Sequence, residues 1–257
     1  MRVALCFSGQ PRNIENPHTW ISHKHHIIDK YHVDVFAHTW INEDERQFEY
    51  SDWVNEKSVT ESKNSNELIL KKYKLKNYIF EKPKIFSLDE ECRKIILERE
   101  DIFFQKYNQK YYSINNENNT LSQLYSVSKS IELIKYEKYD WVILSRYDNY
   151  IWNLPNLYQL DKNNLYLNNR QNFNFSDLLI FGGQSQIESL NCYNKIPELC
   201  KKINYFTPEE FKRVAYQNIY EPTNNKNTYE YTIGQEKRIS IGVGIARLKN
   251  SIENLQI

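Results

Sequence analysis

The chain has 257 residues, a formal net charge of +1 and 26% charged residues. This length suits one α/β domain with a single large core, and the balanced charge argues against a general nucleic-acid or membrane-surface binder. No apolar run approaches the roughly 20 residues that cross a bilayer, and no signal peptide is recognisable. Because the four cysteines are widely spaced without a CxxC pair, we expect a cytoplasmic protein that is at most peripheral at a membrane.

The first predicted element is a buried strand over residues 1–7 (MRVALCF), followed by the loop SGQPR. A loop of small residues after a strand can bring backbone N–H groups close to a ligand. Arg12 can then reach a phosphate or the edge of a base, although an ordinary turn with a solvated arginine explains the same residues. The candidate donor-binding residues of this loop are Ser8, Gly9, Gln10 and Arg12.

A helix over residues 16–31 leads to a second strand over 33–37, which ends in His38, Thr39 and Trp40. His38 and Trp40 are candidates for ligand binding, with packing as the alternative for the tryptophan. His23, His25 and His26 stand at positions i, i+2 and i+3, which do not share one helix face. We therefore interpret these three histidines as a solvated helix surface and not as a metal site.

The middle of the chain is less informative. It predicts a short helix over 66–74, an interrupted strand over 78–86, an amphipathic helix over 89–106 and a polar linker over 108–119. Apolar residues at helical spacing then predict a helix over 121–136. Lys129 on that helix can reach a nucleotide, but a surface lysine is the simpler reading.

The most informative stretch is YDWVILSRYDNYI, residues 139–151. Its apolar run, 141–144, fits a strand buried on both faces, and Arg146 and Asp148 follow where a parallel strand would end. In open α/β sheets, ligands bind outside the carboxyl ends of the strands. Arg146 and Asp148 can there hold a phosphate and a Mg²⁺ ion that keeps its remaining ligands as water and phosphate oxygens. A surface ion pair of little energetic value is the alternative.

The last third of the chain predicts a short strand over 164–167 and an apolar strand that Asp177 opens and a glycine pair closes. Asp177 is a second candidate carboxylate, or a plain turn residue. A helix follows to about residue 203. The sequence Thr-Pro-Glu-Glu at 207–210 is typical of a helix start, which explains both glutamates without catalysis. A final strand is expected over 239–248.

Taken together, these segments resemble the small bacterial and viral glycosyltransferase-like proteins related to the WavE-type lipopolysaccharide synthesis family. The resemblance rests on short motifs in the same order over about 210 residues, with mainly the middle segment unmatched. The motifs are SGQPR (8–12), DVFAHTW (34–40), QLYS (123–126), SRYD (145–148), the segment from Ser176-Asp177 to Phe181-Gly182, and Thr207-Pro208-Glu209.

The resemblance implies one GT-A-like domain over residues 1–257, with a Rossmann-like nucleotide-sugar half to about residue 150 and an acceptor half after it. It implies sugar transfer from a nucleotide-diphosphosugar to a glycan or glycoconjugate, as in polysaccharide biosynthesis. The family's D-x-D motif, which holds Mg²⁺ or Mn²⁺, corresponds here to Arg146-Tyr147-Asp148. Asp148 is then the metal ligand, or alternatively Arg146 stabilises the leaving group itself and makes the metal weak or dispensable. Asp177 is the expected general base of an inverting reaction.

Two other functions fit the same residues. A nucleotidyltransferase of similar layout also presents arginine and aspartate to a nucleotide, although it usually has a first loop richer in glycine and basic residues than SGQPR. A non-catalytic nucleotide- or carbohydrate-binding module would explain the missing first acid of the D-x-D motif.

Overall fold

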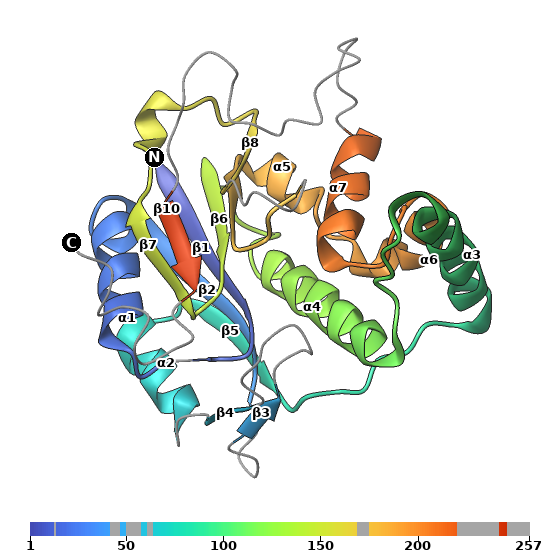
Figure 1. The fold of residues 1–257 in the computed structure, drawn as a ribbon. Coiled ribbons are helices and arrows are strands. Elements are labelled where there is room, and N and C mark those ends of the chain that lie inside the picture. Colours follow the sequence, from blue (N-terminus) through green and yellow to red (C-terminus); the bar gives the residue numbers. More distant parts are fainter. Residues whose placement is uncertain are drawn as a thin grey trace.

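A computed structural model describes residues 1–12, 14–41, 47–49, 58–60, 64–168, 175–219 and 242–245. Its centre is a six-stranded sheet (Figure 1). In order across the sheet the strands are β5 (Asn77–Glu81), β2 (His32–Trp40), β1 (Arg2–Gly9), β6 (Trp141–Ser145), β9 (Leu179–Gly182) and β8 (Leu165–Leu167). The strands β5, β2, β1 and β6 run parallel, whereas β9 is antiparallel to both of its neighbours. The predicted α/β class with a mostly parallel sheet is confirmed, and the antiparallel β9 makes the sheet mixed.

Strand β1 lies in the middle of the sheet and is buried on both faces. Val3, Leu5 and Phe7 point into one hydrophobic cluster, and Ala4 and Cys6 point into another on the opposite face. Side chains alternate across a strand, so this uninterrupted apolar run can fill two layers of core at once.

Helices cover both faces of the sheet (Figure 1). On one face lie α1 (Pro17–His23) with the π-helical turn Lys24–Ile28, and α2 (Ser65–Tyr73); α4 (Ile114–Glu132) and α5 (Gln184–Glu188) cover the other. Beyond α4, a third cluster joins α3 (Glu90–Tyr107), α6 (Ile196–Cys200) and α7 (Pro208–Ile219). None of the described helices is long and apolar enough to cross a bilayer.

The connections between strands create a topological switch point. From β1 the chain moves outward to β2 and β5, and it then returns through α3 and α4 to β6 on the other side of β1. Connections on the two sides of such a point lead away from each other, which leaves an opening at the carboxyl ends of β1 and β6. Strands β8 and β9 come from the second half of the chain and complete the same sheet.

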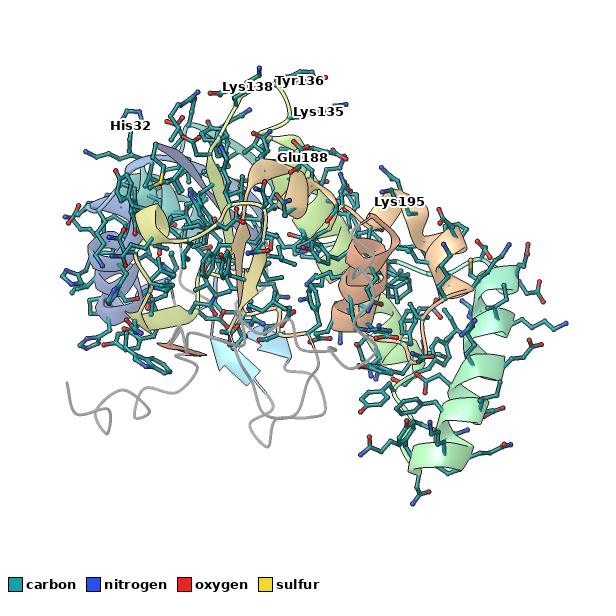
Figure 2. The ribbon with its side chains drawn as sticks, turned by 90° about the horizontal axis from the view of Figure 1, so that it is seen from above. His32, Lys135, Tyr136, Lys138, Glu188 and Lys195 are labelled. Atoms are coloured by element: carbon teal, nitrogen blue, oxygen red, sulfur yellow. The ribbon has the colours of Figure 1, made fainter. Side chains whose placement is uncertain are left out.

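The amino ends of the strands carry a different feature. Arg2 and Lys76 both pair with Asp34 and Glu137, at distances from 2.5 to 2.9 Å. The beginning of β2 at His32 and the loop residues Lys135, Tyr136 and Lys138 lie along this margin of the molecule (Figure 2). This partly exposed network ties the strand starts together, on the side away from the switch-point opening.

Two predictions for the first half of the chain are wrong. His23 is fully buried and its Nδ1 lies 2.9 Å from the Tyr73 hydroxyl, so it does not belong to a solvated surface. The predicted linker over 108–119 is half helical, since α4 begins at Ile114 after Ser113, whose side chain accepts a hydrogen bond from Asn116 N–H. Asparagine has a low helix propensity, so the run of asparagines did not indicate a helix. The Ser113 cap and packing stabilise the helix there.

In the second half, β9 begins two residues after Asp177, which therefore stands in the preceding turn. The helix expected to reach residue 203 is divided into α5, a 3₁₀ turn at Tyr193–Lys195 and α6, with a proline in the first turn of α6. The expected last strand is present as β10 (Gly242–Ile245), antiparallel to β7 (Asn149–Asn153); its flanks lie outside the described residues. The remaining small sheet pairs β3 (Gln47–Glu49) with β4 (Ser58–Thr60).

Candidate functional site

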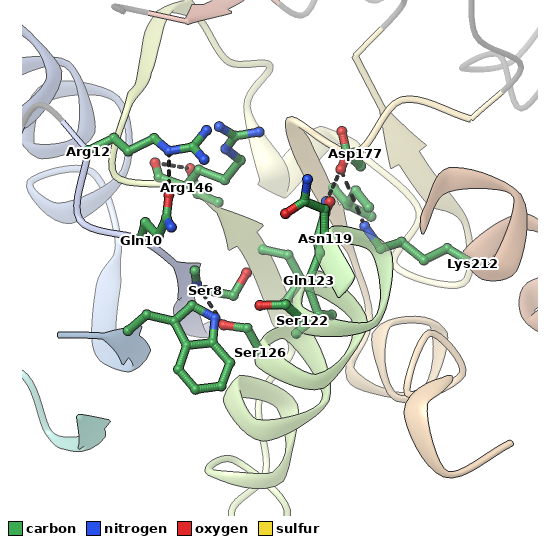
Figure 3. Close-up of a pocket in the computed structure, with 16 residues that line it drawn as sticks. Ser8, Gln10, Arg12, Asn119, Ser122, Gln123, Ser126, Arg146, Asp177 and Lys212 are labelled. Atoms are coloured by element: carbon green, nitrogen blue, oxygen red, sulfur yellow. Dashed lines mark hydrogen bonds and ion pairs between the residues drawn. The ribbon is translucent and has the colours of Figure 1, made fainter. Parts of the chain in front are cut away.

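A pocket of about 230 Å³ lies at the switch point (Figure 3). The ends of β1 and β6 form one side, the middle of α4 forms its floor, and the turn before β9 and helix α7 close the other side. Arg12 and Arg146 lie next to each other at one end, whereas Asp177 and Lys212 face the pocket from the opposite side (Figure 3).

Seven of the candidate residues line this pocket. They are Ser8, Gly9, Gln10, Arg12, Trp40, Arg146 and Asp177. The other three, His38, Lys129 and Asp148, are not among the lining residues. Lys129 pairs with Glu132 at 2.7 Å and lies 5.5 Å from the centre of the Tyr125 ring, as a helix-surface lysine does.

The exit of β1 is held to α4 by its backbone. Gly9 has a φ of +98°, a conformation that favours glycine, and its N–H donates a hydrogen bond of 2.6 Å to Ser126 Oγ. Arg12 Nε donates to Gln10 Oε1 at 2.8 Å, which orients the guanidinium along the pocket. The glycine in SGQPR therefore has a specific conformational role.

The three residues Arg146, Tyr147 and Asp148 have three different environments. Tyr147 is fully buried, stacks on Phe7 with ring centres 4.6 Å apart, and bonds to Thr39 through its hydroxyl at 2.8 Å. Asp148 is buried, and both of its oxygens accept hydrogen bonds from Arg146, at 3.0 and 2.8 Å. Only Arg146 reaches the pocket, and the bidentate bond fixes its orientation.

This arrangement does not fit a divalent metal at Asp148, because the carboxylate is buried and occupied by a guanidinium. Among the described residues, no group of three or more His, Cys, Asp or Glu side chains could hold a metal ion. Asp177 is the carboxylate that lines the pocket, and it pairs with a lysine.

Asp177 and Lys212 form an ion pair in the wall of the pocket. Lys212 Nζ lies 3.5 Å from the Asp177 carboxylate, with 1% and 11% of the two side chains exposed, and Gln123 donates a further hydrogen bond to Asp177 (Figure 3). Burial raises the pKa of Asp177, but the charges of Lys212 and Arg146 outweigh it, so this pKa lies below its ordinary value. The pKa of Glu209, one helical turn before Lys212, is raised by burial and then by the negative charge of Asp177.

His38 lies directly behind the pocket and connects two elements. Its Nδ1 is 2.7 Å from Ser126 Oγ, and its Nε2 is 2.9 Å from Glu81 Oε1. Burial lowers the pKa of His38, and the hydrogen bond to Glu81 offsets only part of this effect. The histidine in HTW thus contacts the pocket through a serine instead of binding a ligand directly.

Several lining residues were not among the predicted site residues. They are Asn119, Ser122, Gln123 and Ser126 of α4, together with Lys212 of α7. The α4 residues repeat at helical spacing beside the apolar residues Leu124, Val127 and Ile131, and such a stripe of polar residues on an amphipathic helix is a signal that the sequence offers. The sequence did not indicate that Lys212 lines a pocket, because a lysine in a charged helix normally lies at the surface.

No family model matches the chain, and no similar sequence was found among curated proteins. The chemistry of the pocket is therefore read from its own residues. Three cationic side chains, a paired carboxylate and several hydroxyl and amide groups suit a polar, anionic ligand.

Proposed function

We propose that this protein is a glycosyltransferase of GT-A-like architecture, which moves a sugar from a nucleotide-diphosphosugar to a glycan or glycoconjugate acceptor. The observation that carries the proposal is the position of Arg12, Arg146 and Lys212 around one pocket at the switch point of a mostly parallel sheet. That position is the usual ligand site of open α/β sheets. The resemblance of the motif order to the WavE-type proteins, whose motifs include Arg12 and Arg146, also motivates the proposal.

The charge in the pocket suits the chemistry of sugar transfer. When the bond between the sugar and the diphosphate breaks, negative charge develops on the departing phosphate, and fixed cations stabilise it. The hydrogen bonds to Asp148 fix the orientation of the Arg146 guanidinium, and Arg12 lies beside Arg146 (Figure 3). A volume of about 230 Å³ is below the roughly 300–1,000 Å³ of pockets for drug-sized ligands, so it would hold the diphosphate and sugar and not the whole donor.

In this proposal the arginines carry the role that a D-x-D metal site has in related enzymes. Assistance by Mg²⁺ or Mn²⁺ stays a prediction that the EDTA arm of the following experiment decides. A cytoplasmic location with contact to a membrane surface, as for a lipid-linked acceptor, also belongs to the proposal.

The test is a donor screen that measures nucleotide release from UDP-, GDP-, CMP- and dTDP-sugars, with Mn²⁺ or with EDTA. We expect one nucleotide to be released, and release that persists in EDTA assigns charge stabilisation to the arginines. Arg146→Gln should lower the rate at least a hundredfold. Arg99→Gln is the matched control, since Arg99 bonds to the Lys201 and Ile203 carbonyl groups and does not line the pocket.

Two outcomes would overturn the proposal. Formation of pyrophosphate from a nucleoside triphosphate and a sugar phosphate would identify a nucleotidyltransferase. Binding of nucleotides measured by calorimetry, without turnover of any donor in the presence of glycan acceptors, would identify a non-catalytic binding module.

A further inference from the structure

A chain of hydrogen bonds leads from the floor of the pocket through the buried His38 to the end of β5. Ser126 on α4 bonds to His38 on β2, and His38 bonds to Glu81 at the end of β5. The partners are 88 and 43 residues apart in the sequence, so the fold alone brings them together. A hydroxyl next to an imidazole that a carboxylate orients is the arrangement that activates hydroxyl groups in enzymes.

The positions of the protons follow from the pairing. Glu81 has a pKa of about 2, because hydrogen bonds from Lys84, His38 and Tyr125 outweigh the effect of burial, so its carboxylate can only accept hydrogen bonds. His38 Nε2 must then carry a proton and donate it to Glu81. With Nε2 protonated in the neutral ring, Nδ1 is an acceptor, and the Ser126 hydroxyl group donates to it.

Ser126 Oγ keeps one bonding direction for a ligand. A serine hydroxyl group donates one hydrogen bond and accepts two. Ser126 Oγ lies 2.7 Å from His38 Nδ1 and 3.4 Å from the His38 carbonyl oxygen, so its proton goes to the nearer Nδ1, and it accepts from Gly9 N–H at 2.6 Å. The second acceptor position remains, and Ser126 is the member of the chain that lines the pocket.

We propose that Ser126 accepts the proton of the attacking hydroxyl group and passes its own proton to His38, which makes His38 the final proton acceptor of the transfer. The inference rests on the proposed sugar transfer and names its general base. The acceptor oxygen forms a bond to the anomeric carbon as its O–H bond breaks. The bond from that carbon to the diphosphate breaks, its electron pair leaves with the nucleoside diphosphate, and the proton ends on His38 Nδ1. A direct displacement of this kind inverts the anomeric configuration.

Asp177, the base expected from the sequence, is less suited to this step. Its carboxylate is paired with Lys212 and Gln123, and a carboxylate stabilised in its charged form binds a proton weakly. His38 is neutral near pH 7, and the imidazolium that forms is stabilised by Glu81. In this scheme Asp177 holds Lys212 and Gln123 in place.

The charges around His38 determine its titration. Glu81 at the end of β5 favours the protonated ring, whereas Lys84 beyond β5 and Lys129 on α4 oppose it. On the remaining sides lie the rings of Trp40 and Tyr125, with centres 4.8 and 5.5 Å away. Turnover should therefore have an acid limb below pH 6.5, where His38 becomes protonated and cannot accept a proton.

The test compares Ser126→Ala and His38→Gln with the wild type, in turnover of the donor found by the screen. We expect kcat to fall about a hundredfold or more in both variants, with KM for the donor changed less than threefold. The acid limb should disappear in His38→Gln, which keeps the bond between Gly9 and Ser126. Ser130→Ala is the matched control, because Ser130 is buried one turn further along α4 and bonds to the Val127 carbonyl group.

If Ser126 and His38 act only in folding, their variants will have lower stability but an unchanged kcat and an unchanged acid limb. That result overturns the inference. Retention of configuration in the product, or a protonated Nδ1 in the ¹⁵N spectrum of His38 at pH 7, overturns it too. In those cases the wild type still turns over a nucleotide sugar, so the proposed function stands. A wild type that turns over no donor overturns both.

Discussion

Single residues in the motif after β6 show how closely spaced charges can have separate roles. Arg146 and Asp148 are two residues apart, yet the first lines the pocket and the second is buried beneath it. Tyr147 anchors this turn, because its ring fills a core position against Phe7. The carboxylate thus positions an arginine that faces the ligand.

Asp148→Asn should weaken binding of the nucleotide sugar about tenfold, equally with Mn²⁺ and with EDTA, because Arg146 loses its bidentate partner. The free energy of unfolding should fall by about 2–3 kcal/mol, less than for a fully buried pair because Arg146 remains partly exposed. Calorimetric titration and urea unfolding measure the two effects. Asp140→Asn, at the opposite end of β6, is the control, and weakening seen only with Mn²⁺ would make Asp148 a metal ligand.

Gly9→Ala should lower the free energy of unfolding by about 1–2 kcal/mol, because its φ of +98° is unfavourable for a residue with a Cβ atom. No other atom lies within 4 Å of where the Cβ would be, so the cost comes from the backbone conformation and not from a clash. Gly9→Asn should cost less, since asparagine tolerates positive φ better. Equal unfolding midpoints for Gly9→Ala and the wild type would contradict this reading.

Among the elements, α4 contributes most to the site. One stripe of the helix, with Asn119, Ser122, Gln123 and Ser126, forms the pocket floor, and the apolar residues of the other faces enter two hydrophobic clusters. Its first turn is fixed by the Ser113 cap and by Glu117, which accepts hydrogen bonds from Arg93 and Leu88 N–H. The start of this helix therefore determines where Asn119 faces the pocket.

Ser113→Ala should reduce the free energy of unfolding by about 1 kcal/mol and increase hydrogen exchange of the first turn of α4, because the Asn116 N–H loses its acceptor. Thermal unfolding and amide exchange detected by mass spectrometry measure these effects. Ser113→Asp keeps a capping oxygen and should behave like the wild type. Unchanged exchange in Ser113→Ala would show that Glu117 alone holds this end.

The stability of the whole molecule should depend on pH through His23. Burial lowers its pKa to about 3, whereas the unfolded chain has a value near 6.5. Between these values the unfolded state binds more protons, so the stability present above pH 6.5 is lost as the pH falls toward 3.

From pH 7 to pH 4.5, the free energy of unfolding of the wild type should fall about 2 kcal/mol more than that of His23→Gln. Urea unfolding at both pH values measures the difference. His25→Gln is the control, because His25 is an exposed histidine two residues further along the chain. If the free energy of unfolding falls equally in the wild type and in His23→Gln, groups other than His23 are responsible for the acid sensitivity.

The sequence by itself determined the α/β class and the central strands. The apolar runs at residues 1–7, 33–37 and 141–144 are β1, β2 and β6, because strands buried on both faces need continuous apolar sequence. Thr207 caps α7 as expected, and Asp89 caps α3 in the segment where a helix was predicted, since capping depends on neighbours in the chain. The rule that ligands bind at the carboxyl ends of strands also brought Arg12 and Arg146 to one pocket. Asp177 joins them because β9 runs antiparallel to β6, which puts the amino end of β9 at the same edge of the sheet.

Only the tertiary structure decided what each polar side chain does there. Nothing near His38 in the sequence indicates Ser126 or Glu81, and nothing near Lys212 indicates a buried partner in Asp177. His23 was assigned to the surface because helical spacing shows which residues share a face, but not which face is covered. Local patterns arise from neighbours in the chain, whereas the protonation and pairing of a polar group depend on burial and on contacts between distant segments.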